Sequence, residues 1–185
     1  YQPGFLFLPF GTYGPEDVVQ PKRKFMRKGI SYINGAITAL DPGGQKVTLS
    51  DGTVLAYDHL IIATGTHPTP SETPGLEGPE YGHTVHDFYT FDGAMALRET
   101  LKDFKAGRMV MNLIEMPIKC PVAPLEFAFL ADAYLTRRGI RDKTELVYVT
   151  PLDGPFTKPK ASAKLAEMFE RRSILVEPDF SVESY

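Results

Sequence analysis

The feature that most constrains the fold is the run His59–Ala63, which is almost entirely apolar and leads into the small residues Thr64 and Gly65. A continuous apolar run of this length is typical of a β-strand that is covered on both faces. Strands of that kind occur in parallel sheets, where crossover helices cover the two faces. We therefore predict an α/β fold in which His59–Ala63 is a buried strand.

An antiparallel β-meander is predicted immediately before this run. Residues Tyr32–Leu40 and Gln45–Leu49 have strand patterns, and the turn Asp41–Gly44 separates them because proline fixes φ and glycine accepts positive φ. Asp51-Gly52 is a hairpin signal, and Thr53–Ala56 is the return strand.

The second half of the chain alternates between helical and β patterns. It follows Thr66–Pro79, a segment with four prolines and two glycines that predicts a linker or domain crossing. The βαβαβ order predicts a parallel sheet with right-handed crossover helices. The predicted helices are Asp92–Phe104, Pro124–Arg138 and Ala161–Arg172, and the predicted strands are Arg108–Ile114, Glu145–Thr150 and Ile174–Val176.

Composition excludes several classes of protein. The net charge is -3 with Lys and Arg interspersed among acids, so no basic stripe indicates a nucleic-acid partner. The sequence has neither a signal peptide nor an apolar run of the roughly 18 residues that a membrane helix needs. The chain has one cysteine, which is either a buried thiol or a reactive thiol whose partner lies elsewhere. Because no Met begins the sequence and Tyr1 starts within an element, we expect a part of a longer protein.

The meander followed by Ala63-Thr64-Gly65 resembles the FAD domain of flavoproteins with two dinucleotide-binding domains. In that family small residues at the end of the strand let the backbone approach the flavin nucleotide. The resemblance implies FAD contacts at Thr64 and Gly65 and an adenine-side contact around Ala36. The alternative is a meander in an unrelated α/β protein. The GxGxxG turn that holds the FAD pyrophosphate in this family does not occur in the sequence.

A second GxGxxG turn would follow the strand Arg108–Ile114 in reductases that use NADH. Residues 115–124 contain no glycine, and Pro121 and Pro124 lack the amide donors that bind a pyrophosphate. The sequence therefore argues against an NADH site at this turn.

The run Cys-Pro-x-x-Pro-x-Glu, from Cys120 to Glu126, resembles sulfide:quinone oxidoreductases and the flavin subunit of flavocytochrome c sulfide dehydrogenases, which belong to the FAD-dependent pyridine nucleotide-disulfide oxidoreductase superfamily. The resemblance implies that Cys120 carries sulfur beside the flavin and pairs with a second cysteine outside this sequence, and that Glu126 accepts a proton. A helix dipole and Lys119 would favour the thiolate. The alternatives are a small buried hydrophobe for Cys120 and helix stabilisation for Glu126.

On this resemblance, residues 1–78 are the second part of a FAD-binding domain and residues 79–185 are an incomplete, vestigial NAD(P)-binding-like Rossmann domain. Many members have a third cysteine, but the corresponding region, Asp87–Phe91, has none. The full-length enzyme would oxidise sulfide or a related sulfur species and reduce a quinone, whereas the isolated chain is not expected to retain FAD or turn over.

Two other functions stay open: a type II NADH:quinone dehydrogenase and a non-catalytic α/β assembly module. The resemblance places the full-length protein in the cytoplasm or at a membrane periphery, with contact through a C-terminal part outside this sequence, and a homo-oligomer is left open. His83 and His86 have a spacing that suits a metal, but no third ligand converges on them, so we predict no metal site.

Overall fold

The computed structural model describes residues 1–183, which divide into two compact units. Tyr1–Val19 and residues 67–183 form the larger unit, and Gln20–Thr66 forms the smaller unit. The first residues of the chain thus pack with its second half. The domain boundary after residue 78 stays a prediction.

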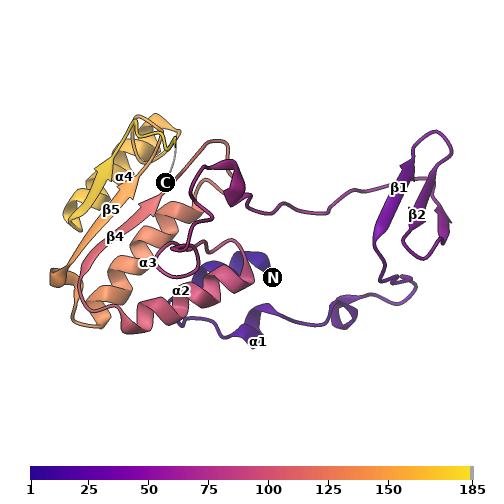
Figure 1. Ribbon diagram of the computed structural model, residues 1–185, viewed down its shortest axis with the longest axis horizontal. Helices are drawn as coiled ribbons and strands as arrows, with labels where there is room; N and C mark the ends of the chain where they lie inside the picture. The colour runs from indigo at the N-terminus through magenta and orange to yellow at the C-terminus, as the bar shows by residue number, and fades with distance from the viewer. Residues whose placement is uncertain (184–185) are drawn as a thin grey trace. The chain divides into compact units, whose positions relative to one another are not determined.

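The larger unit is built on a parallel sheet (Figure 1). Its strands are β4 (Gly107–Asn112), β5 (Thr144–Val149) and β6 (Ile174–Glu177), in the order β4-β5-β6. Gly107 pairs with Thr144 at one end of the β4–β5 ladder and Asn112 pairs with Val149 at the other. Leu146 pairs with Ile174. The predicted parallel pairing is confirmed.

Three helices connect and flank these strands: α2 (Phe91–Asp103), α3 (Ala123–Arg137) and α4 (Pro159–Arg171). The Thr90 side chain caps α2 by accepting a hydrogen bond from the Gly93 amide at 3.0 Å. Gly139, at φ +67°, follows the end of α3 in the left-handed conformation that favours glycine. The predicted helices are confirmed to within two residues. No helix within residues 1–183 is long and apolar enough to cross a membrane.

One hydrophobic core joins the beginning of the chain to α3, α4 and the sheet. The N-terminal segment contributes η1 (Gln2–Phe7) and α1 (Pro15–Val18). The ring of Phe10 packs on that of Phe127, with the ring centres 5.1 Å apart. The ring of Phe169 in α4 packs on that of Tyr148 in β5, with the ring centres 5.3 Å apart. Ring contacts of this kind add to the free energy of apolar burial. Aromatic contacts therefore join the beginning of the chain to α3, and α4 to β5.

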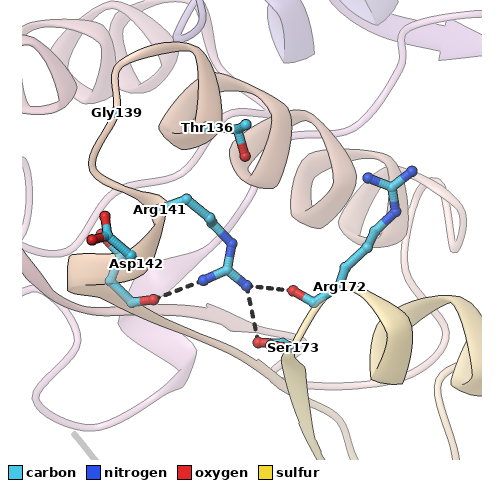
Figure 2. A pocket seen from close by; sticks show the side chains of 7 residues that line it. Thr136, Gly139, Arg141, Asp142, Arg172 and Ser173 are labelled. Atoms are coloured by element: carbon cyan, nitrogen blue, oxygen red, sulfur yellow. Dashed lines mark hydrogen bonds between the residues drawn. The ribbon is translucent and has the colours of Figure 1, made fainter.

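A buried carboxylate connects several elements at the amino edge of the sheet, where the parallel strands begin. Asp132 of α3 accepts hydrogen bonds from Arg141 Nε at 2.7 Å and from Arg172 Nη1 at 2.8 Å. Arg141 belongs to η4 (Arg141–Lys143) and also donates to the carbonyl oxygens of Arg172 and Ser173, as Figure 2 shows. This network fastens the end of α4 and the start of β6 to α3.

The smaller unit holds the predicted antiparallel meander. Its strands are β1 (Ile37–Asp41), β2 (Lys46–Leu49) and β3 (Val54–Ala56), in the order β1-β2-β3. Both pairings are antiparallel, so the meander is confirmed. The remaining elements are the short 3₁₀ helices η2 (Lys22–Phe25) in this unit and η3 (Pro70–Glu72) in the larger one.

The first strand of the meander is shorter than predicted. It begins at Ile37, not at Tyr32. Its partner strand ends at Leu49, and the chain then turns at Asp51-Gly52, where the Asp51 side chain accepts from the Thr53 amide at 2.9 Å. Residues 32–36 therefore have no strand opposite them.

The prediction of a buried strand at His59–Ala63 is wrong for this structure. These residues belong to no strand, and Leu60, Ile61 and Ile62 are 39%, 88% and 68% exposed. A parallel strand needs hydrogen-bonding neighbours, and the described residues of the smaller unit supply none for this run. The hydrophobic side chains that this unit does bury are Val47 and Leu49.

We expect Asp132→Ala to lower the free energy of unfolding by about 3 kcal/mol, because it leaves two arginines without their carboxylate partner. Urea unfolding measures this change as a lower midpoint. Asp142→Ala is the matched control, since Asp142 is an exposed aspartate on the neighbouring η4 and should change stability by no more than ~0.5 kcal/mol. Equal midpoints for the two variants would contradict the structural role of Asp132.

Candidate functional site

Cys120 lies in the turn between β4 and α3, at the carboxyl edge of the parallel sheet. Ligands of open α/β sheets bind at this edge. The Leu113 amide continues the ladder by donating to the Val149 carbonyl at 2.9 Å, and the Cys120 carbonyl accepts from the Ala123 amide at 3.2 Å, where α3 begins. Cys120 is half-buried and packs against the hydrophobic core. Its thiol therefore combines partial access with a fixed place ahead of a helix.

A tyrosine contacts this turn from the segment before α2. The Tyr89 hydroxyl donates to the Cys120 carbonyl oxygen at 3.2 Å. Burial raises the pKa of Tyr89 to about 12, and electrostatic interactions with the side chains of Cys120 and Glu126 add to this rise. The hydroxyl is therefore protonated, and able to donate, throughout the physiological pH range.

Asp87 shapes the segment that presents Tyr89. Its Oδ1 accepts from the amides of Tyr89 at 2.9 Å and Thr90 at 2.7 Å. Its Oδ2 accepts from the Tyr81 hydroxyl at 3.0 Å. Burial, followed by the charge of Asp87, raises the pKa of Tyr81 to about 12. The carboxylate of Asp87 thus fixes the backbone of this segment at Tyr89 and Thr90.

Glu126 occupies the first turn of α3 and is exposed. After burial and Cys120, its carboxylate is a further cause of the raised pKa of Tyr89, whose hydroxyl contacts the Cys120 carbonyl. A carboxylate in the first turn is also stabilised by the helix dipole. The geometry is therefore compatible both with the predicted proton acceptor and with the alternative of helix stabilisation.

The residues predicted to contact FAD all lie in the smaller unit. Ala36 precedes β1, and its carbonyl accepts from the Ser50 amide at 2.8 Å. Thr64 and Gly65 are exposed. Gly65 has φ +76° and open space where a side chain would begin. Such an exposed backbone fits the close approach of a nucleotide.

Sequence patterns missed Tyr89 as a site residue, because Phe88, Tyr89 and Phe91 are most simply core aromatics. Its hydrogen bond joins positions 31 residues apart, so no local motif reveals it. His83 and His86 were predicted not to bind a metal. The Nε2 atom of His86 lies within hydrogen-bond distance of two protein oxygens, the His83 carbonyl at 2.8 Å and the Thr100 hydroxyl at 2.9 Å. Within residues 1–183, no group of three or more His, Cys, Asp or Glu side chains is placed to hold a metal ion.

The hollow drawn in Figure 2 lies at the amino edge of the sheet, away from the Cys120 turn. It is lined by Arg141 and Arg172, among others. Both arginines are already paired with Asp132. We therefore assign this hollow to the structural network at that edge.

The comparisons with known proteins identify one family. Residues 11–111 match the family described as pyridine nucleotide-disulphide oxidoreductase. The mitochondrial sulfide:quinone oxidoreductase of Dictyostelium discoideum is 27% identical over 94% of this chain and 39% of its own length. The sulfide-quinone reductase of Aquifex aeolicus is 31% identical over 94% of this chain and 41% of its own.

A solved structure of the Aquifex aeolicus sulfide:quinone oxidoreductase resembles the whole chain. It has a TM-score of 0.83 at 25% identity, and the alignment covers 100% of this chain and 43% of the other. An NADH dehydrogenase-like protein of Mycobacterium tuberculosis is 35% identical, but over only 43% of this chain and 18% of its own length. The chain thus spans about two-fifths of the sulfide:quinone oxidoreductases that it matches.

Acid should destabilise the larger unit partly through His86. Burial lowers the pKa of His86 in the folded state, so protonation favours the unfolded chain. The stability that neutral His86 contributes is fully present above the unfolded pKa of about 6.5, and it is lost as the pH falls through the lowered folded pKa.

Urea unfolding at about pH 7.5 and at about pH 5.5 measures how much unfolding free energy is lost on acidification, and this loss should be smaller for His86→Gln than for wild type. His67→Gln, at an exposed histidine, is the control. An equal loss in all three proteins would contradict this prediction.

Proposed function

The chain belongs to the pyridine nucleotide-disulphide oxidoreductase family, and we propose that it is part of a longer FAD-dependent enzyme that oxidises sulfide or a related sulfur compound and reduces a quinone. One observation carries this proposal. The similarity to sulfide:quinone oxidoreductases extends over 94% of the chain, whereas the similarity to the NADH dehydrogenase-like protein extends over 43%. The turn with Cys120 supports the same choice, because it carries a thiol and prolines where an NADH-binding turn carries glycines.

In the proposed reaction, Cys120 supplies one sulfur of a disulfide, and a second cysteine outside this sequence supplies the other. A sulfide anion attacks one sulfur, the sulfur–sulfur bond breaks, and a persulfide and a thiolate form. Glu126 accepts the proton that the attacking hydrosulfide anion carries into the persulfide. When bound, FAD would supply the acceptor for the two electrons that the thiolate and the persulfide carry, and the quinone would be the final oxidant.

Ala36, Thr64 and Gly65 are the residues of this chain that we propose to contact FAD. The exposed glycine with positive φ supports this assignment, because it leaves the backbone open to a nucleotide. The pyrophosphate is held in related domains by a GxGxxG turn at a helix N-terminus, and this sequence has no such turn. We therefore propose that residues 1–185 alone do not retain FAD and do not turn over.

The second candidate from the same superfamily is a type II NADH:quinone dehydrogenase. Pro117, Pro121 and Pro124 lack amide donors and flank Cys120 in the turn where the NADH pyrophosphate would bind. A non-catalytic assembly module is the candidate of another class. Visible flavin absorbance in purified full-length protein would exclude that module as a description of the whole.

We expect Cys120→Ser in the full-length protein to slow the reduction of the flavin by sulfide by orders of magnitude, because it removes the sulfur nucleophile. Flavin binding should survive, since the proposed FAD contacts lie in the other unit. Stopped-flow absorbance measures both properties. Val122→Ser, at an exposed position of the same turn, is the matched control and should keep the wild-type rate.

A purely structural Cys120 predicts a different result. The serine variant would then lose about 1–2 kcal/mol of stability through burial of a hydroxyl. Its rate of flavin reduction by sulfide would equal that of wild type, and this outcome would remove Cys120 from the mechanism.

We also expect that NADH does not reduce the flavin of the full-length protein, because the proline-rich turn offers too few amide donors for a pyrophosphate. Anaerobic titration with NADH should leave the flavin absorbance unchanged, while sulfide in the same cuvette bleaches it. Rapid bleaching by NADH would favour the dehydrogenase instead.

A further inference from the structure

We propose that Tyr89 is a positioning residue that holds the Cys120 turn and thereby sets the exposure of the thiol. This inference rests on the proposed function of Cys120 and deepens it. Its basis is the hydrogen bond from the Tyr89 hydroxyl to the Cys120 carbonyl oxygen, at 3.2 Å. The hydroxyl contacts the backbone of Cys120, so its effect on the sulfur acts through the conformation of the turn.

Tyr89 is itself fixed from three sides. Its amide donates to Asp87 Oδ1 at 2.9 Å, and its carbonyl accepts from Gln2 Nε2 at 3.2 Å. Its ring stacks on Phe88, with the ring centres 4.9 Å apart. A hydroxyl held in this way defines a fixed point for the turn that it contacts, because little side-chain entropy remains to be lost.

The same stack also fixes the far end of the turn. Phe88 stacks on Phe127 at 4.9 Å with the rings inclined by only 11°, and Phe127 belongs to α3. We call Tyr89, Phe88 and Phe127 the aromatic stack. It contacts the beginning of α3 through Phe127 and the backbone of Cys120 through Tyr89. Both the helix and the cysteine ahead of it therefore share one support.

The Tyr89 hydroxyl stays protonated over the pH range in which an ordinary thiol ionises. An unperturbed cysteine has a pKa near 8.5, whereas burial and electrostatic interactions with nearby side chains raise the pKa of Tyr89 to about 12. The Tyr89 phenol therefore remains a hydrogen-bond donor throughout this pH range. A change in thiol reactivity caused by Tyr89 can then be measured near neutral pH without titration of the phenol.

The test compares Tyr89→Phe with Tyr134→Phe in the full-length protein. Each variant removes only a hydroxyl and retains the ring. The Tyr134 hydroxyl also donates to a backbone carbonyl, that of Leu101 at 3.4 Å, and its ring also packs against the hydrophobic core. Both variants thus remove a hydroxyl that donates to a backbone carbonyl, but only Tyr89 contacts the Cys120 turn.

The primary measurement is the rate at which iodoacetamide alkylates Cys120 in the reduced protein, followed by mass spectrometry of its peptide. Cys120 is the only cysteine of residues 1–185, so its peptide is unambiguous. We expect Tyr89→Phe to raise the alkylation rate roughly fivefold, because the released turn exposes the thiol. A factor of this size corresponds to the free energy of one net hydrogen bond. Tyr134→Phe should keep the wild-type rate. Equal rates for the two variants would overturn the positioning role.

A second measurement separates positioning from general loosening. The thermal midpoints of the two variants should fall by similar amounts, while the reduction of the flavin by sulfide should slow only in Tyr89→Phe. A slowing that is equal in both variants would identify a merely structural effect. Should Tyr89→Phe fail to fold, Gln2→Ala removes the anchor of the Tyr89 carbonyl and should raise the alkylation rate by a smaller factor, and no rise would overturn the proposal.

The failure of this inference is distinguishable from the failure of the proposed function. If Cys120→Ser abolishes flavin reduction while Tyr89→Phe leaves alkylation unchanged, only the positioning role is wrong. If Cys120→Ser leaves flavin reduction unchanged, the proposed function is wrong, and the alkylation rates still report whether Tyr89 holds the turn.

Discussion

The stacking of Phe88 on Phe127 is the contact on which the carboxyl edge of the sheet depends. It joins the segment before α2 to the beginning of α3, two parts of the chain that no secondary structure connects. Phe127 in turn packs on Phe10, so the beginning of the chain supports the same layer. The turn with Cys120 lies against this layer and has its own link to it through Tyr89.

The two edges of the parallel sheet are stabilised by different physics. At the amino edge, the buried carboxylate of Asp132 is paired with two arginines, and Arg141 satisfies the carbonyls at the end of α4. At the carboxyl edge, two phenols donate to backbone carbonyls: the half-buried Tyr89 to that of Cys120 and the buried Tyr148 to that of Pro155. The arginines of the charged network are paired with Asp132, whereas the thiol of Cys120 at the other edge is half-buried.

Local sequence signals predicted those elements whose partners lie within this chain. Asp51-Gly52 predicted the hairpin, and the alternation after Arg108 predicted the parallel sheet, because these patterns depend on neighbours that are present. The prediction that the apolar run His59–Ala63 is buried was wrong. An apolar pattern indicates that a strand is stable when other elements pack on its faces, but it does not show that those elements are present. The contact between Tyr89 and Cys120 was beyond sequence reasoning, because it results from tertiary packing of two aromatic residues that resemble ordinary core.

The central claim is that Cys120 changes its redox state during the reaction. Peptide mapping of the full-length protein, alkylated under denaturing conditions before and after addition of sulfide, tests this claim most directly. We expect the Cys120 peptide to be joined to a second cysteine through a disulfide in the resting protein, and sulfide to make Cys120 available to alkylation as the flavin is reduced. A Cys120 that is free and fully alkylated both before and after sulfide, while the flavin is still reduced, would contradict it.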